Sequence, residues 1–186
     1  MILDVTEFNA SGSLLSAAGG DRRAWDALVD RYSGLVWAVA RSHRLSHADA
    51  ADVYQATWLR LVEHLGDIRD GSRVGAWLAT TARHEALALM RRSRRDLPVA
   101  DFDASIADLT AGVDDRLLEA EEHQALWRAF ARLSGRCPQL LRVIFSDPPP
   151  TYAEMSAALD IPVGSIGPTR ARCLANLQTA LAGATT

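Results

Sequence analysis

The sequence predicts an all-α protein of two small helical domains joined by an acidic, flexible linker. Apolar residues recur at helical spacing in several segments, and no segment alternates apolar and polar residues as a half-buried strand would. An aspartate-rich stretch with a proline and a glycine interrupts this pattern at 96–115. A chain of 186 residues has room for two helical domains of about 70 residues each. We therefore expect one domain at 12–95 and another at 116–182.

Three helices are expected in the N-terminal domain. The first begins near Trp25, from which apolar residues follow the i, i+3, i+4, i+7 pattern for four turns. Ser46 and Asp49 have the spacing of a capping box, which would open the second helix. After a polar loop at 66–72, Ser72 is expected to cap a long third helix that ends in the arginine run RRSRR. The side chains expected to be buried are Tyr54, Trp58, Leu61, Val62 and Leu65 in the second helix, and Trp77, Leu78, Ala82 and Leu89 in the third.

Four helices are expected in the C-terminal domain. The DPPP stretch at 147–150 should end the second of them, because proline cannot continue a helix interior. Thr151 and Glu154 have the spacing of another capping box, which would open the third. The four helices are expected at 116–133, after Pro138, at 151–159 and at 165–181.

The last two helices have the anatomy of a helix–turn–helix. Ile161 and Val163 would fill the corner between them, and Ser165 would cap the second helix. The N-terminal part of such a helix fits the major groove of DNA. A helical hairpin that only packs, with its arginines in solvent, is the alternative interpretation. The residues expected on the open face of the second helix or at its edges are Ser165, Gly167, Pro168, Thr169, Arg170 and Arg172.

Charge is distributed unevenly along the chain. Its 20 basic residues are all arginine, and the net charge of −3 argues against a stand-alone nucleic-acid binder. Residues 83–95 hold five arginines and one glutamate, a local charge of +4, whereas residues 96–115 hold six aspartates and no basic residue, a local charge of −6. The arginines could neutralise a nucleic-acid backbone, and the acidic stretch should be an extended, self-repelling tether.

Several classes of function find no support in the sequence. No phosphate loop, metal-ligand set or nucleophile–base pair indicates an enzyme, a cofactor, a metal or a small-molecule substrate. No apolar run could span a bilayer and the N-terminus does not resemble a secretory signal, so a cytoplasmic protein without membrane insertion is expected. In that reducing compartment, Cys137 and Cys173 should be small buried hydrophobic residues rather than a disulfide. His43 and His47 lack the further ligands of a zinc site.

Three stretches resemble the extracytoplasmic-function sigma factors of bacteria (group IV). Residues 51–60, ADVYQATWLR, are similar to the conserved region 2 helix of that family, and residues 66–95 are similar to its promoter-melting loop and helix. Residues 133–145, LSGRCPQLLRVIF, and the helix–turn–helix are similar to its region 4. The blocks have the order and spacing of the family. The positions that differ from the family's common residues are Ala56, His84 and Asp160, where the family often has glutamate, asparagine and glycine.

The resemblance implies a sigma factor that binds core RNA polymerase, recognises minus-35 and minus-10 promoter elements and melts the DNA. Its partners would be the largest and second-largest polymerase subunits, promoter DNA and, as is common in the family, an anti-sigma factor. The acidic linker would thread the active-centre cleft of the polymerase. The residues that would dock on the clamp helices of the largest subunit are Asp52, Gln55, Leu59 and Arg60.

The resemblance also implies which residues bind DNA. The loop at 67–73 would hold a base flipped out of the minus-10 non-template strand, and nearby arginines would neutralise the strand's backbone. The open-face residues of the helix–turn–helix would read the minus-35 element. The residues implied for minus-10 DNA are Asp67, Arg69, Asp70, Ser72, Arg73, Arg83, His84, Arg91 and Arg92.

Two other functions fit parts of the sequence. A stand-alone helix–turn–helix repressor or activator would bind an operator tightly without polymerase. An adaptor that binds only proteins would keep its function when Arg170 and Arg172 are replaced by alanine.

Overall fold

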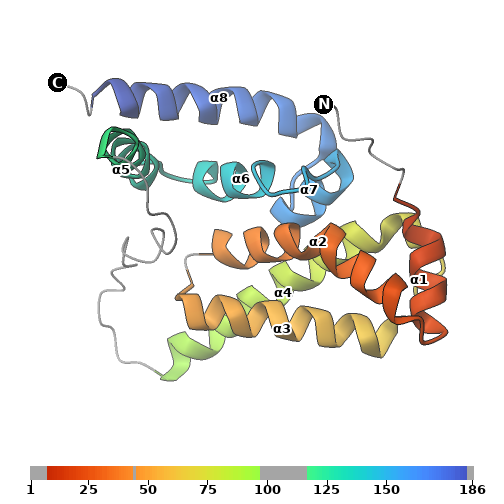
Figure 1. Cartoon of the computed structure of the whole chain (residues 1–186). Coiled ribbons are helices and arrows are strands. Elements are labelled where there is room, and N and C mark those ends of the chain that lie inside the picture. Colours follow the sequence, from red (N-terminus) through yellow and green to blue (C-terminus); the bar gives the residue numbers. More distant parts are fainter. Residues whose placement is uncertain (1–7, 44, 97–116, 184–186) are drawn as a thin grey trace.

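The computed structural model describes residues 8–43, 45–96 and 117–183 of the chain, and every regular element in these ranges is a helix (Figure 1). The predicted all-α class is confirmed. Most of the predicted acidic linker, at 97–115, lies outside the described residues, and the predicted domain boundaries stay predictions.

The first half of the chain forms four α-helices and one short 3₁₀ helix, and every N-cap that the structure describes in it is polar. Asn9 and Asp21 cap the first two helices, and Ser46 caps the third by accepting a hydrogen bond from the backbone N–H of Asp49 at 3.1 Å. The first helix is too short to show a clear apolar period, and it was not predicted. The elements are α1 (Ala10–Ala18), α2 (Arg22–Ser42), α3 (His47–His64), η1 (Gly71–Arg73) and α4 (Val74–Asp96).

The second half of the chain forms four more helices. The predicted capping box of Thr151 and Glu154 is confirmed, because each residue's side chain accepts a hydrogen bond from the other's backbone N–H. Asp160 follows the third of these helices in the left-handed conformation, with φ of 54°, which aspartate tolerates better than most residues. The helices are α5 (Leu117–Ala131), α6 (Cys137–Ile144), α7 (Tyr152–Leu159) and α8 (Val163–Ala182).

The helices of the two halves share one hydrophobic core. Figure 1 shows α6, α7 and α8 stacked against the bundle of α2, α3 and α4. The largest cluster of buried apolar side chains includes Leu35 and Leu78 from the N-terminal half together with Val143, Met155 and Ile166 from the C-terminal half. The two halves therefore form a closed arrangement, in which α7 lies against α4.

Four local predictions are wrong. Ser72 does not cap α4, because it lies inside η1, where Asp70 is the cap. Ser165 lies in the first turn of α8, whose N-cap is Pro162, since the helix begins at Val163. Val163 does not fill the corner of the helix–turn–helix and Val62 is not buried, because their side chains point outward.

The two cysteines also correct a prediction. Cys137 at the start of α6 and Cys173 in α8 form a disulfide, with their Cα atoms 5.1 Å apart. Both residues are buried, as predicted, beside Leu140 and Leu141. The expectation of free thiols rested on the redox compartment, whereas the fold brings two residues 36 positions apart in sequence into bonding geometry.

Candidate functional site

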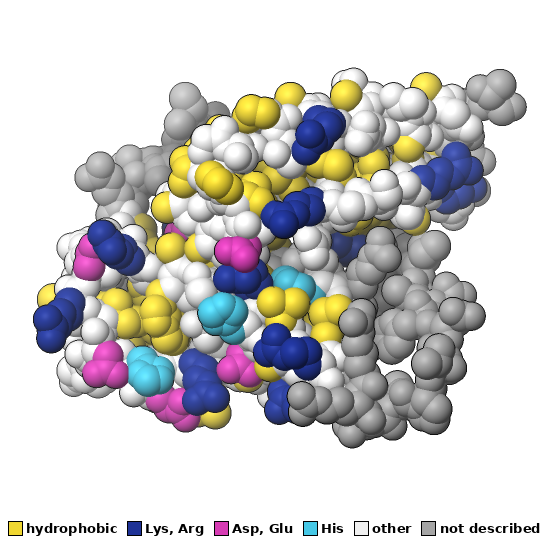
Figure 2. Space-filling model, turned by 180° about the vertical axis from the view of Figure 1, so that it is seen from behind, with side chains coloured by type: hydrophobic (Ala, Val, Ile, Leu, Met, Phe, Trp, Pro, Cys, Tyr) yellow, Lys and Arg dark blue, Asp and Glu magenta, His cyan; other side chains and the backbone are white. Residues whose placement is uncertain are grey.

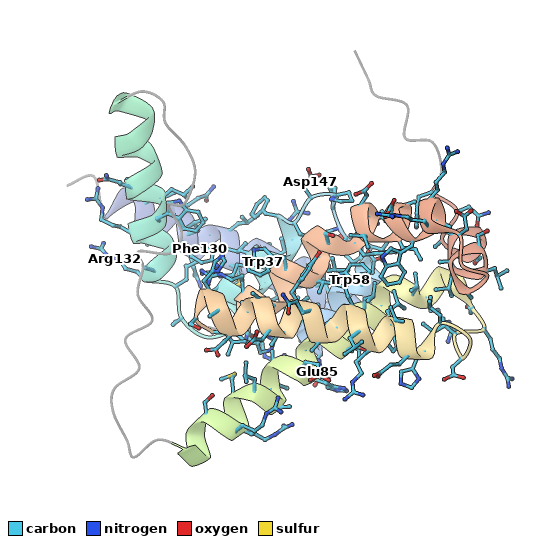
Figure 3. All side chains as sticks on the ribbon, turned by 60° about the horizontal axis from the view of Figure 1, so that its bottom comes forward. Trp37, Trp58, Glu85, Phe130, Arg132 and Asp147 are labelled. Atoms are coloured by element: carbon cyan, nitrogen blue, oxygen red, sulfur yellow. A yellow bond between two sulfur atoms is a disulfide. The ribbon has the colours of Figure 1, made fainter. Side chains whose placement is uncertain are left out.

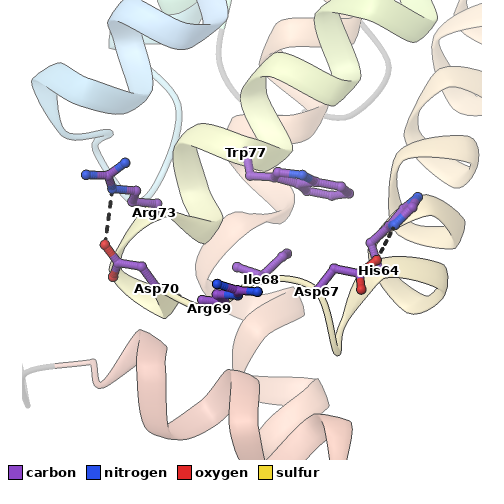
Figure 4. A pocket seen from close by; sticks show the side chains of 7 residues that line it. All are labelled: His64, Asp67, Ile68, Arg69, Asp70, Arg73 and Trp77. Carbon is purple, nitrogen blue, oxygen red and sulfur yellow. Dashed lines mark hydrogen bonds and ion pairs between the residues drawn. The ribbon is translucent and has the colours of Figure 1, made fainter.

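A cavity of about 320 Å³ lies at the loop that joins α3 to α4. Aspartates and arginines from this loop surround it, and Ile68 and an indole ring provide apolar walls (Figure 4). The loop at 67–73 is the one predicted to hold a flipped base, and the structure forms a recess there. The residues that line the cavity are His64, Asp67, Ile68, Arg69, Asp70, Arg73 and Trp77.

Hydrogen bonds within the loop hold its charged groups in place. Oδ1 of Asp70 accepts hydrogen bonds from the backbone N–H and the hydroxyl of Ser72, at 3.1 and 2.5 Å. Oδ2 of Asp70 lies 3.1 Å from Nε of Arg73. The Ser72 hydroxyl is the largest of the influences that hold the pKa of Asp70 below its ordinary value. The carboxylate therefore stays ionised, and it orders the turn that enters α4.

Trp77 both packs against the core and lines the cavity. Its side chain is half-buried against the shared core, as predicted. Its indole also lines the cavity and lies beside the ring of His64, with centroids 6.2 Å apart (Figure 4). An aromatic face beside arginines is the combination on which single-stranded bases stack.

The other residues predicted for minus-10 DNA are spread along α4. Arg91 and Arg92 are exposed 18 and 19 residues beyond Arg73, which is about 27 Å along a helix. His84 is exposed between the two ends. Arg83 is set apart from the others, because its side chain is only 17% exposed and pairs with Asp160 of the helix–turn–helix.

The residues predicted to bind polymerase lie on one exposed face of α3. Asp52, Gln55 and Leu59 recur at i, i+3 and i+7, and the Leu59 residue is 60% exposed. Val62 extends this face by one further step and is 52% exposed. Its i+3 spacing from Leu59 could have indicated that both residues share one exposed face, but Val62 was predicted to be buried in the core.

Arg60 lies beside this face and is held by two carboxylates. Its Nη1 lies 3.1 Å from Glu63 and its Nε lies 3.4 Å from Glu85 on α4. These pairs raise the pKa of Arg60, with the hydrogen bond to Glu85 contributing most. Figure 3 shows Glu85 at the side of α4 that meets α3. Arg60 thereby links the two helices that present the predicted polymerase and minus-10 residues.

A second cavity, of about 460 Å³, opens between α2 and α3 beside Gln55. The sequence did not predict this cavity. Its walls come from two helices, and only the folded structure shows which of their residues face each other. Tyr54 lines it and shares a hydrogen bond of 3.0 Å with the Ser33 hydroxyl. The other lining residues are Gly34, Trp37 and Ala51.

The first turns of α8 present the residues predicted for minus-35 DNA. Ile166 and Cys173 are buried on the inner face of this helix. Ser165, Pro168, Arg170 and Arg172 are exposed, and Gly167 and Thr169 are half-buried. The structure thus places all six predicted residues in the part of α8 that a major groove could accept.

The described surface carries charges of both signs. On the face seen in Figure 2, arginines alternate with acidic and histidine side chains and form no continuous basic patch.

Among the described residues, no group of three or more His, Cys, Asp or Glu side chains could hold a metal ion. None of the described helices is both long and apolar enough to cross a membrane.

Comparison with known proteins finds one family match, in the N-terminal half of the chain. Residues 28–96 match the family Sigma-70 region 2. The chain is also similar to CnrH in a structure described as CnrH in complex with the cytosolic domain of CnrY, with a TM-score of 0.61 and 20% sequence identity. That match covers 94% of this chain and 97% of the other, so the fold is shared over nearly the whole length. The search of curated proteins found no match.

Proposed function

We propose that this chain, a sigma factor of the extracytoplasmic-function type, binds core RNA polymerase and directs initiation at promoters with minus-35 and minus-10 elements. The predicted resemblance to that family is confirmed by the region 2 match and by the shared fold. The sigma-70 family is not a family of enzymes.

The observation that carries the proposal is the position of the loop cavity relative to the exposed face of α3. The loop that lines the cavity joins the end of α3 to the start of α4. The predicted polymerase-binding residues Asp52, Gln55 and Leu59 lie on α3 itself. One rigid element can therefore anchor the chain on polymerase while the adjacent loop receives a base. Cationic side chains such as Arg69 would attract the backbone of the displaced strand.

The helix–turn–helix would supply the second promoter contact. Arg170 and Arg172 are exposed on α8 and could reach base edges or phosphates. Because the net charge is −3, the long-range attraction to DNA is weak, and we expect the chain to bind promoters firmly only within the larger polymerase.

Reconstitution tests this proposal. The purified chain, mixed with core polymerase and a library of promoter fragments, should yield initiation at a defined subset of sequences. A gel-shift comparison with and without core polymerase separates the proposal from a stand-alone helix–turn–helix regulator, which would shift its operator alone. No binding to core polymerase would disprove the proposal.

A protein partner is also proposed. CnrH is described in complex with the cytosolic domain of CnrY, and we expect an anti-sigma protein to bind this chain. Co-purification of the chain with the product of a neighbouring gene, followed by loss of core-polymerase binding, is the expected result. Unchanged core-polymerase binding in the presence of that product would contradict it.

A further inference from the structure

We propose that helix α1 positions the loop at 67–73 for the base that this loop receives, and that it does so through a backbone contact between Ser11 and Gly71. Helix α1 lies outside residues 28–96, the part of the chain that matches the region 2 family. The inference rests on the proposed function, because it concerns the base-binding role of the loop.

Gly71 of the 3₁₀ helix η1 lies directly against the backbone of Ser11 in α1. A Cβ atom on Gly71 would be closest to Cα of Ser11 and would lie 2.9 Å from both N and Oγ of that residue, so that one of the two segments would have to move. Gly71 is buried, and its φ is not positive. The close approach of α1, and not the backbone conformation of the loop, therefore requires glycine at this position.

Apolar contacts and a polar cap fix α1 to the bundle. Leu14 is 2% exposed in the shared core, and the Phe8 ring lies edge-on to the ring of Tyr32, with centroids 5.8 Å apart. Asn9 caps the helix by accepting a hydrogen bond from the backbone N–H of Gly12 at 2.9 Å. A helix held along one side and at its first turn can act as a fixed support for a segment that packs on it.

Little else holds the loop against the bundle. Within residues 67–73 only Gly71 is buried and only Ile68 is half-buried, and the other five residues are exposed. A segment with few buried contacts samples several conformations, and a ligand that needs one of them binds more weakly. In the view of Figure 4, α1 passes below the loop, whereas Trp77 lies above it. Helix α1 therefore supports this wall of the cavity from the side opposite the indole.

Gly71 is also placed to transmit its position to the cavity. It lies between Asp70 and Arg73, which both line the cavity and are joined by the contact of 3.1 Å between Oδ2 of Asp70 and Nε of Arg73. Because η1 is a single short turn capped by Asp70, a shift of Gly71 away from α1 would move both charged side chains relative to Trp77. The contact between α1 and η1 therefore sets the shape of the recess in which a base would stack.

Gly71→Ala tests the inference in the full chain bound to core polymerase. The probe is a single-stranded minus-10 oligonucleotide from a promoter selected in the reconstitution, compared with the same strand carrying an abasic site at each position in turn. An abasic site keeps the phosphates but offers no base, so the Kd for the abasic strand divided by the Kd for the intact strand measures base binding apart from backbone binding.

The expected result is a loss of base binding alone. In the wild type, one position should give a ratio of about ten, the effect of losing one stacked base. Gly71→Ala should lower this ratio to about two, because the recess is no longer held in the shape that binds the base. The Kd for the abasic strand and the Kd for core polymerase should both stay at their wild-type values.

Gly66→Ala is the matched control. Gly66 belongs to the same connection between α3 and α4, its φ is not positive, and a Cβ atom on it would meet nothing within 4 Å. This variant should keep the wild-type ratio. Asn9→Ala is a second test, because loss of the cap should fray the first turn of α1, where Ser11 lies, and lower the ratio about twofold. Asn9→Ala carries the test if circular dichroism shows that Gly71→Ala is misfolded.

The outcomes separate this inference from the proposed function. Wild-type ratios in both Gly71→Ala and Asn9→Ala would overturn the positioning role of α1 and leave the sigma-factor role standing. Equal losses for the intact and abasic strands would overturn it as well, because they would show general destabilisation and not misplacement of the base. A wild type with a ratio of one at every position would mean that the loop receives no base, and the base-binding part of the proposed function would then fail together with the inference.

Discussion

Nη1 of Arg83 in α4 lies 3.3 Å from Oδ2 of Asp160, the left-handed residue that ends α7. These residues are 77 positions apart in sequence, and each has a separate expected role, one in minus-10 DNA and the other in the corner of the helix–turn–helix. In the closed arrangement the Asp160 carboxylate pairs with the Arg83 guanidinium, the group that a DNA phosphate would need. If Arg83 binds minus-10 DNA as predicted, protein and DNA compete for it, whereas Arg69 in the loop has no ion pair with another described residue.

Arg69→Ala should weaken binding of the polymerase-bound chain to a single-stranded minus-10 oligonucleotide about threefold to tenfold, because it removes a backbone contact. The slope of log K against log salt should become less steep by about 0.7, the value for one phosphate contact on a single strand. Fluorescence anisotropy at several salt concentrations measures both quantities. Arg22→Ala on the exposed start of α2 is the control, and an equal loss in both variants would show that Arg69 has no specific role.

Leu59→Ala should raise the Kd for core polymerase about tenfold, because an exposed leucine on the predicted docking face would become buried on binding. Its free energy of unfolding should change by less than about 0.5 kcal/mol, as for most surface substitutions. Leu15→Ala on α1 is a matched control, since Leu15 is 73% exposed and lies outside that face. Titration of labelled core polymerase measures the effect, and identical Kd values for both variants would exclude Leu59 from the interface.

The helices that could be predicted from the sequence are those with a long amphipathic period or a polar cap. The positions of α2, α3 and α4 follow from apolar residues at helical spacing, and the capping box of Thr151 and Glu154 follows from two residues alone. Helix α1 was missed because only Leu14 is buried in its nine residues. An N-cap was also assigned to the wrong residue where two nearby polar residues could each cap a helix, as Asp70 and Ser72 could.

The closed arrangement could not be predicted, because it depends on contacts between residues far apart in sequence. Nothing local to Gly34 or Gly75 indicates that another helix or loop will approach within van der Waals distance. The loop at 67–73 was predicted as a base-binding element from its composition, but its aromatic wall was not, since Trp77 has the helical spacing of a core residue. The disulfide was missed because the expected reducing compartment argued against it, and because only the fold brings two residues 36 positions apart into contact.

The bond between Cys137 and Cys173 should stabilise the protein substantially. It closes a loop with a sequence separation of 36, for which the chain-entropy model gives about 4 kcal/mol, an upper value when native strain is absent. Thermal unfolding with and without a phosphine reductant should show a lower Tm under reduction. The double variant Cys137→Ala, Cys173→Ala should be insensitive to the reductant. Two free thiols in the unreduced, denatured protein would contradict the bond.

Acidification should destabilise the chain through His43, the residue that follows α2. His43 is buried, and its Nδ1 lies 2.9 Å from the carbonyl oxygen of Val39. Burial lowers the pKa of His43 below its ordinary value of 6.5, the hydrogen bond to Val39 opposes this change, and the nearby charge of Arg83 adds to it. A folded-state pKa below the unfolded value means that the unfolded chain binds the proton more tightly. The stabilising contribution is therefore complete above pH 6.5 and is lost as the pH falls through the folded-state pKa.

Comparison with His43→Asn isolates this contribution from other groups that titrate. Asparagine can donate a hydrogen bond to the same carbonyl oxygen and is accepted after the end of a helix, but it has no proton to gain. Between pH 7.5 and pH 5.5, the free energy of unfolding from urea titrations should fall more steeply for the wild type than for His43→Asn. Parallel curves would mean that His43 titrates equally in the folded and unfolded chains. Protonation of His43 at low pH is also expected to weaken the contact between the two halves, because it would place a second positive charge near Arg83.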